Sequence, residues 1–212
     1  NKTFEVIDQS GSNICACLPI NKLATKSAKE KISKSDLILV IGGDGTMIGS
    51  IRGLNELNIP FLGINLGRVG FLTDINPNNI VSLEKILKGQ FIKEKRPIFQ
   101  ASTTSKKKEI FINEVVIHSG SVAKMIDLEI SAGRESIYQL KADGIIVSSP
   151  TGSTAYSYSG GGPVVSPKVN ALTLLPMFSH SSSSHSLLMP ENKNIEVKIK
   201  NTENLSAEIV ID

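Results

Sequence analysis

Gly42-Gly43-Asp44-Gly45-Thr46 is the segment best suited to chemistry, because it places one carboxylate among three glycines. Glycine lets the backbone approach a phosphate closely, with successive N–H groups pointing at the anion. A carboxylate beside phosphates is unfavourable unless it holds a cation or accepts a proton. Both uses occur in phosphoryl transfer. The segment therefore predicts a nucleotide-handling turn containing one acid, with an ordinary Gly-Asp-Gly turn as the alternative.

This turn differs from two other phosphate-binding motifs. The chain contains no Gly-x-x-x-x-Gly-Lys-Ser/Thr sequence, which excludes a P-loop. Counted from Gly43 and Gly45, the third glycine of a Rossmann-type dinucleotide fingerprint is replaced by Ile48.

The apolar run 37–41 directly precedes the turn and predicts a strand buried on both faces of a parallel sheet. Ligands of such sheets bind beyond the carboxyl ends of the strands, where Asp44 would lie. Thr46 is expected to cap a helix over 47–57. The remaining predicted elements are strands over 4–7 and 61–64 and helices over 24–32 and 80–87. This alternation predicts a doubly wound parallel α/β domain over residues 1–96.

A second glycine-bearing loop, residues 65–71, follows the predicted strand 61–64 at the same edge of the sheet. The two loops could face one ligand. Arg68 is suited to contacting phosphate, and an exposed turn arginine is an equally good explanation of it.

After Arg96-Pro97 the pattern changes to short strands separated by turns. The predicted strands cover 110–118, 125–130, 136–140, 144–148, 195–199 and 207–211. Ala132-Gly133-Arg134-Glu135 predicts a hairpin turn between two of them. Residues 97–212 are therefore predicted to form an all-β domain.

Two further segments of this half carry polar groups in unusual numbers. Residues 143–163 are crowded with hydroxyls and glycines, which suits hydrogen bonding to a flat polar ligand. A flexible Ser/Gly linker is the alternative, against which Pro150, Tyr156 and Tyr158 argue. Asn113-Glu114 interrupts an apolar strand, so one of the pair must face inward, where ribose hydroxyls could satisfy a carboxylate. A solvent-facing pair on an edge strand is the alternative.

Composition narrows the possible partners. A net charge of +3, 5% aromatic residues and no tryptophan argue against nucleic acid. No apolar segment approaches the roughly 20 residues that span a bilayer, so no membrane is expected. Cys15 and Cys17 are too close for a relaxed disulfide and lack the partners of a zinc site. We therefore expect reduced thiols and a cytoplasmic protein, with a removed organellar targeting segment as the alternative.

Three blocks occur in order along the chain: Gly42-Gly43-Asp44-Gly45-Thr46, then Asn113-Glu114, then Asp143-Gly144 running into Thr151-Gly152-Ser153-Thr154-Ala155-Tyr156-Ser157. With these blocks the chain resembles the NAD kinases over roughly residues 36–190. The last block is specific to that family, whereas diacylglycerol-type lipid kinases share the first. The resemblance implies an α/β domain followed by a β-sandwich domain. It also implies transfer of the γ-phosphate of ATP to the 2′-hydroxyl of the adenosine ribose of NAD, which yields NADP.

The resemblance further implies a role for each matching residue. Asp44 would be the general base, Mg²⁺ would neutralise charge, and Asp143 would reach a neighbouring subunit's site in a homodimer or homotetramer. The other implied contacts are Gly43, Gly45 and Thr46 along the triphosphate, Phe71 near the adenine, Asn113 and Glu114 at the ribose, and Thr151, Thr154, Ala155, Tyr156 and Ser159 around the base and amide groups.

The chain departs from the family pattern in three places. It lacks the family's first strand, and it ends at Asp212, where the family typically continues with Gly-Gln, so we expect a portion of a longer protein. The third departure is at residues 176–186. His180 matches a family histidine, but His185 and Ser186 stand where the family carries arginine and proline. Two histidines without a third ligand do not predict a metal site. Two alternative functions remain. A lipid kinase would share the first turn but has no need of Asn113-Glu114, and a non-catalytic dinucleotide sensor could lose Asp44.

Overall fold

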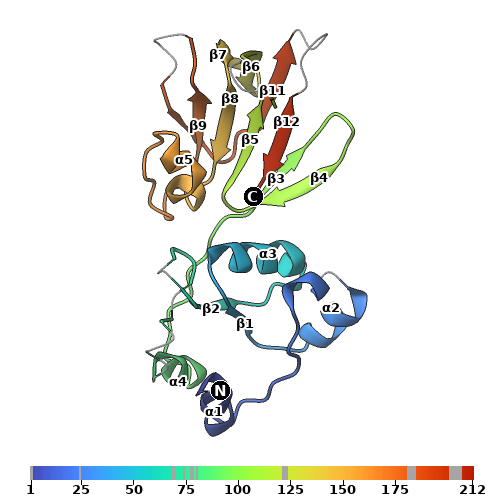
Figure 1. Cartoon of the computed structure of the whole chain (residues 1–212), viewed down its shortest axis with the longest axis vertical. Helices are drawn as coiled ribbons and strands as arrows, with labels where there is room; N and C mark the ends of the chain where they lie inside the picture. The colour runs from blue at the N-terminus through green and yellow to red at the C-terminus, as the bar shows by residue number, and fades with distance from the viewer. Residues whose placement is uncertain are drawn as a thin grey trace. The chain divides into compact units, whose positions relative to one another are not determined.

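The computed structural model describes residues 2–23, 25–67, 70–73, 75, 76, 79, 81–120, 124–180, 185–200 and 207–212 (Figure 1). The chain divides into two compact units, Asn1–Glu94 and Lys95–Asp212. The first unit mixes helices with parallel strands, and the second is built from antiparallel strands. The predicted fold class, an α/β domain followed by a β-sandwich domain, is confirmed.

The first unit centres on two parallel strands. Its elements are α1 (Lys2–Gln9), η1 (Ile20–Lys22), α2 (Lys26–Ile32), β1 (Ile38–Ile41), α3 (Asp44–Leu54), η2 (Asn55–Leu57), β2 (Phe61–Ile64) and α4 (Val81–Leu87). β1 pairs with β2 from Ile38 opposite Phe61 to Ile41 opposite Ile64. Ile75 adds a further parallel bridge to Ile64, which brings the chain back beside β2 after the intervening loop.

Alternating side chains of β1 and β2 bury apolar surface on both faces of this small sheet. Leu39 and Leu62 belong to a cluster that includes residues of α1 and α4. Ile38 and Phe61 belong to a second cluster with residues of α2 and η2. Helices therefore cover both faces, as a parallel sheet requires.

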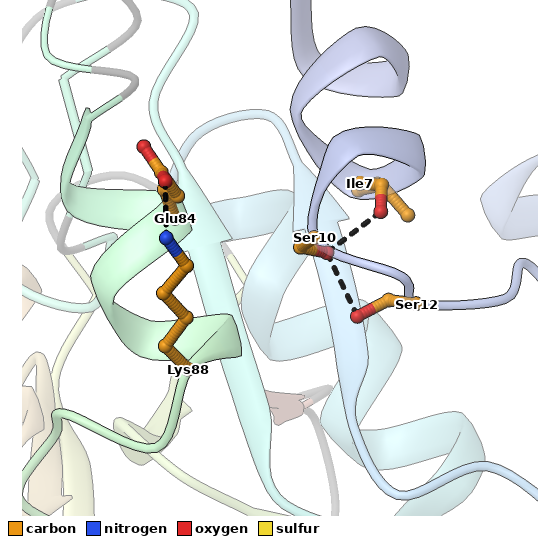
Figure 2. A network of polar contacts seen from close by, with 5 residues as sticks. All are labelled: Ile7, Ser10, Ser12, Glu84 and Lys88. Carbon is orange, nitrogen blue, oxygen red and sulfur yellow. Dashed lines mark hydrogen bonds and ion pairs between the residues drawn. The ribbon is translucent and has the colours of Figure 1, made fainter.

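The helices α1 and α4 share one of these clusters, and Figure 2 shows their polar contacts. At the end of α1, the Ser10 hydroxyl donates to the carbonyl of Ile7 at 2.6 Å and contacts the hydroxyl of Ser12 at 2.9 Å. Directly after α4, Lys88 pairs with Glu84 of that helix at 2.6 Å, one helical turn away, and lowers the pKa of the Glu84 carboxyl.

The strand predicted at residues 4–7 is wrong, because this segment lies in α1. Thr3, Val6, Ile7 and Ser10 are the partly buried positions, and they follow the spacing of a helix rather than the alternation of a strand. A short apolar run does not distinguish the two structures by itself. The strand predicted over 61–64 is confirmed with its bounds, as β2, and the other elements predicted for this unit are present with shifted ends. Residues 24 and 80, two predicted helix starts, lie outside the described residues.

The second unit contains two packed antiparallel sheets and a hairpin. Its elements are β3 (Phe99–Ser102), β4 (Lys108–Phe111), β5 (Glu114–His118), β6 (Ile126–Ala132), β7 (Glu135–Ala142), β8 (Gly144–Ser148), η3 (Gly152–Thr154), α5 (Tyr156–Ser159), β9 (Ala171–Met177), β10 (Leu187–Pro190), β11 (Ile195–Lys200) and β12 (Glu208–Ile211). In the described residues the sheet orders are β10-β9-β8-β5-β12 and β11-β6-β7, with β3 and β4 paired separately.

One apolar core joins the two larger sheets. Ile126, Leu128 and Ile130 of β6 are buried in the same cluster as Ile145 of β8 and Leu174 of β9. This is the packing of a β-sandwich. The opposite face of β8 and β9 carries a smaller cluster that includes Ile146 and Leu175, and Gly160 at the end of α5 lies against both side chains.

The hairpin predicted at residues 132–135 is confirmed. Ala132 of β6 pairs with Glu135 of β7, and Gly133 has φ of +63°, a conformation that favours glycine. The single strand predicted over 110–118 is wrong, because β4 ends at Phe111 and β5 begins at Glu114. The strands β3, β9 and β10 were not predicted; β9 contains Pro176, a residue type that usually argues against a central strand.

Candidate functional site

Asp44 lies at the junction of β1 and α3, beyond the carboxyl end of the strand. The Gly42 N–H donates to the carbonyl of Ile64 at 2.9 Å and extends the parallel pairing. Gly43 is extended and is the N-cap residue, so Asp44 is the first residue of the helix. The prediction that Thr46 caps this helix is wrong, because Thr46 lies within its first turn. The Thr46 side chain instead packs against Gly42. A Cβ at Gly42 would lie only 2.6 Å from the Thr46 Oγ1 atom.

Both carboxylate oxygens of Asp44 are held by the loop that follows β2. Oδ2 accepts from the N–H of Phe71 at 2.8 Å, and Oδ1 accepts from the N–H of Leu72 at 3.1 Å. The hydroxyl of Thr73, itself 5% exposed, approaches Oδ1 at 3.5 Å. The two glycine-bearing loops of the sequence therefore meet at one side chain.

The surroundings of Asp44 suit an anionic ligand. The first turn of a helix leaves N–H groups without intrahelical partners, and its dipole favours negative charge. Gly43 and Gly45 are exposed, and a Cβ at either position would meet nothing within 4 Å. The Phe71 side chain is 67% exposed, which leaves its ring free to stack on a ligand. Arg68 lies outside the described residues.

In the second unit, Asn113 and Glu114 are both buried, with 7% and 4% exposure. The alternative of a solvent-facing pair on an edge strand is therefore wrong. Glu114 lies at the start of β5, which pairs with β8 on one side and β12 on the other. Asn113 lies in the turn before β5, and its Nδ2 donates to Oδ2 of Asp212 at 3.3 Å.

The pKa of the Glu114 carboxyl is raised well above its usual value. Burial, and after it the negative charge of Asp212, raise this pKa to about 7, while a hydrogen bond from the Tyr156 N–H acts in the opposite direction. Its Oε2 atom is buried without a hydrogen-bond partner. A buried carboxylate oxygen without a donor is costly, so this atom is a natural acceptor for a ligand hydroxyl.

The hydroxyl-rich segment is an ordered loop rather than a flexible linker. Ser149, which is fully buried, donates its N–H to the carbonyl of Asn113 at 2.8 Å and its hydroxyl to the carbonyl of Ile112 at 2.5 Å. The same hydroxyl accepts from the N–H of Gly152 at 3.1 Å. A Cβ at Gly152 would lie 2.2 Å from the Asn113 carbonyl oxygen. The structure thus brings the Asn113-Glu114 motif and the hydroxyl-rich loop together.

The other residues predicted in this loop differ in exposure. Thr151 is 5% exposed; its hydroxyl accepts from the guanidinium of Arg96 at 3.4 Å, and its carbonyl accepts from the Thr154 hydroxyl at 3.3 Å. Ala155 is partly buried, whereas Tyr156 and Ser159 are exposed. Asp143 is partly buried between β7 and β8, where its N–H donates to the carbonyl of Met177 at 3.0 Å.

Four residues that support these motifs were not predicted: Gly70, Arg96, Ser149 and Asp212. Gly70 and Ser149 lie inside the two segments, residues 65–71 and 143–163, that the sequence already indicated, so their position was a usable signal. Arg96 and Asp212 are distant in sequence from the residues they contact, and no local pattern marks them.

Among the residues that the structure describes, neither unit shows a metal centre built from protein side chains. Within the described part of the chain, no three His, Cys, Asp or Glu side chains are grouped to hold an ion. Cys15 and Cys17 are exposed and free. None of the helices described has the length and apolar character needed to cross a bilayer.

Family models match both halves of the chain. The ATP-NAD kinase N-terminal domain matches residues 4–91, and the ATP-NAD kinase C-terminal domain matches residues 112–212. The chain is 40% identical over 210 residues to the NAD kinase of Pseudoalteromonas translucida, covering 96% of this chain and 70% of that protein. It is 38% identical over 208 residues to the NAD kinase of Escherichia coli O1:K1 / APEC, again covering 96% and 70%.

Solved structures agree with these matches. An NAD kinase from Archaeoglobus fulgidus in complex with ATP superposes with a TM-score of 0.80 at 26% identity, covering 100% of this chain and 78% of that chain. Yeast NADH kinase complexed with NADH superposes with a TM-score of 0.75 at 26% identity, covering 87% of this chain and 55% of that chain.

The α/β unit with its acidic glycine turn and the following β-sandwich define a nucleotide-binding kinase. The chain belongs to the ATP-NAD kinase family. The family predicted from the three motifs is confirmed, and these matches favour it over a lipid kinase or a non-catalytic sensor.

Proposed function

We propose that this NAD kinase family member transfers the γ-phosphate of ATP to the 2′-hydroxyl of the adenosine ribose of NAD, yielding NADP. The observation that carries the proposal is the position of Asp44. Its carboxylate begins α3 beyond the end of β1, where exposed glycines and helix N–H groups suit a triphosphate. A carboxylate so close to phosphates is unfavourable unless it accepts a proton or binds a cation. Phosphoryl transfer to a hydroxyl supplies that proton.

In the first unit, Asp44 takes the proton of the attacking hydroxyl as general base. The N–H groups of Phe71 and Leu72 hold its two oxygens, which leaves further lone pairs for the substrate. Gly43, Gly45 and Thr46 line the triphosphate, and Arg68 contacts phosphate. Phe71 packs near the adenine, a role that its exposed ring supports.

In the second unit, Asn113 and Glu114 bind ribose hydroxyls. The unpartnered Oε2 of Glu114 supports this role, because an ionised carboxylate accepts hydrogen bonds and donates none. The remaining proposed contacts to the base and amide groups are Thr151, Thr154, Ala155, Tyr156 and Ser159. Ala155 acts through its backbone groups, because its side chain has no polar atom. The Thr151 hydroxyl already accepts from Arg96 and keeps its O–H to donate to a ligand.

Magnesium fits this site as a companion of the nucleotide. Mg²⁺ is commonly held by one or two carboxylates together with substrate phosphates, rather than by a cage of protein ligands. Asp44 is a carboxylate near the proposed phosphates, so we assign it to hold the ion together with them. When bound, the ion would neutralise charge on the phosphates.

Three further features are proposed with the activity. The domain boundary falls between residues 96 and 97, the location is cytoplasmic, and the protein is a homodimer or homotetramer in which Asp143 reaches a neighbouring subunit's site.

One assay tests the proposed function. The protein is incubated with ATP, Mg²⁺ and NAD, and NADP is measured with an NADP-specific dehydrogenase. Matched reactions replace NAD with diacylglycerol or omit ATP. NADP formed only with both substrates supports the proposal; phosphorylation of diacylglycerol without NADP formation overturns it in favour of a lipid kinase, and NAD binding without turnover favours a sensor.

A further inference from the structure

The carbonyl oxygen of Asp212 holds the turn that presents the proposed ribose-binding pair. The N–H groups of Ile112, Asn113 and Glu114 all donate to this oxygen, at 3.2, 3.0 and 3.3 Å. The N–H of Asp212 in turn donates to the carbonyl of Glu114 at 3.0 Å. Three successive N–H groups converging on one oxygen form a concave backbone arrangement of the kind that binds anionic groups. The turn between β4 and β5 is therefore shaped around Asp212.

The side chain of Asp212 contacts the same pair. The Asn113 Nδ2 donates to its Oδ2 at 3.3 Å, and this bond orients an amide that is 7% exposed. The charge of Asp212 also acts on Glu114, whose pKa it raises in addition to the larger effect of burial. Asp212 thus influences both members of the pair while lying on a different strand end, directly after β12.

We infer that Asp212 is a positioning residue for dinucleotide binding, which orients the Asn113-Glu114 turn through its carbonyl oxygen and its carboxylate. This inference rests on the proposed function, because it takes Asn113 and Glu114 as contacts of NAD. Asp212 acts through these two residues.

The neighbours of Glu114 make the electrostatic part of the inference specific. Among the described residues, Asp212 is the charged group that acts on the Glu114 carboxyl. The Tyr156 N–H, at the start of α5, donates a hydrogen bond to the same carboxyl. Ser148 of β8 lies opposite Glu114 in the sheet. Since an ionised Glu114 is the better acceptor, NAD affinity rises with pH as Glu114 deprotonates near pH 7. Removal of the Asp212 charge moves that midpoint to lower pH.

Two substitutions separate the two parts of the role. Asp212→Asn keeps the backbone carbonyl and a side-chain acceptor for Asn113 but deletes the charge. Asp212→Ala also deletes the acceptor. Glu208→Gln is the matched control, because Glu208 begins β12, the strand that Asp212 directly follows. The Glu208 carboxylate faces His118 at 3.8 Å and its side chain is 63% exposed.

The experiment is a titration of each whole protein with NAD in the absence of ATP between pH 5.5 and 8.5. We expect Asp212→Asn to bind NAD as tightly as wild type at pH 8.5, with the pH midpoint shifted downward. We expect Asp212→Ala to show the same shift and a Kd raised by about fivefold to tenfold at pH 8.5, as for one lost hydrogen bond. Glu208→Gln follows wild type. A merely structural role would not move the midpoint.

Glu114→Gln, titrated with NAD and with ATP, distinguishes the two ways of failing. If Glu114→Gln leaves NAD affinity and its pH dependence unchanged, the assignment of Glu114 to NAD fails, and with it this part of the proposed function. If Glu114→Gln weakens NAD more than ATP while both Asp212 variants behave like Glu208→Gln, the role of Asp212 is overturned and the proposed function stands.

Discussion

The carboxylate of Asp44 occupies the space that a side chain at Gly70 would need. A Cβ at Gly70 would lie 2.1 Å from Oδ1 of Asp44 and 2.5 Å from its Cγ. The next two residues, Phe71 and Leu72, donate their N–H groups to the same carboxylate. The absence of a side chain at Gly70 thus allows the loop to close on the proposed catalytic base.

Gly70→Ala should displace this carboxylate and impair turnover. Because a misplacement of about 1 Å in a catalytic group can cost on the order of 10²-fold, we expect kcat to fall by that order. Steady-state kinetics with saturating ATP and NAD measure it. The matched control is Gly53→Ala in α3, where a Cβ would make an ordinary 3.7 Å contact with Leu23. That variant should keep full activity and gain about 0.5–1 kcal/mol of stability.

Asp44→Asn should lower kcat by at least about 10²-fold, because a positioned general base contributes roughly 10²–10⁴. Asparagine offers one side-chain acceptor oxygen, so the Phe71 or the Leu72 N–H loses its partner. We therefore expect NAD binding, measured without ATP, to weaken by no more than about 1 kcal/mol. Turnover near that of wild type would remove Asp44 from catalysis and leave it as an anchor of the loop.

Glu114 should make the folded state less stable as pH rises. Its pKa is about 7 in the folded protein against a usual 4.5, so between these values the folded state binds more protons than the unfolded state. Stability then falls as pH rises through this window, by up to about 3 kcal/mol for the whole shift. Denaturant unfolding of wild type and Glu114→Gln at pH 4.5 and pH 8 measures the difference. The variant should gain stability relative to wild type at pH 8; an equal difference at both values contradicts the prediction.

Mixed subunits should test the proposed sharing of sites. Asp44→Asn and Asp143→Ala are each expected to be inactive alone. In a closed oligomer, subunit exchange would combine an intact Asp44 with an intact Asp143 of a neighbour and restore part of the activity. Light scattering establishes the oligomeric state, and labelled subunits confirm exchange. A mixture that stays inactive after exchange, or an active wild-type monomer, would exclude shared sites.

The amino-acid sequence alone determined the features that depend on neighbouring residues. The bounds of β2 and β8, the hairpin at Gly133 and the three chemical motifs were all predicted, because periodicity and turn chemistry act over a few residues. The same motifs identified the family, since their residue types are dictated by the ligand chemistry.

Only the tertiary structure decided which distant groups meet. Residues 4–7 form a helix because Val6 and Ile7 both pack on one side, against a cluster that includes β2 and α4. The strand predicted over 110–118 breaks because its turn closes around the carbonyl of Asp212. Gly70 beside Asp44, and Asp212 beside Glu114, lie far apart in sequence, and their contacts depend on how loops and strand ends converge. Local sequence patterns do not predict these contacts. The contacts depend on burial and on the pairing of hydrogen-bonding groups across the whole unit.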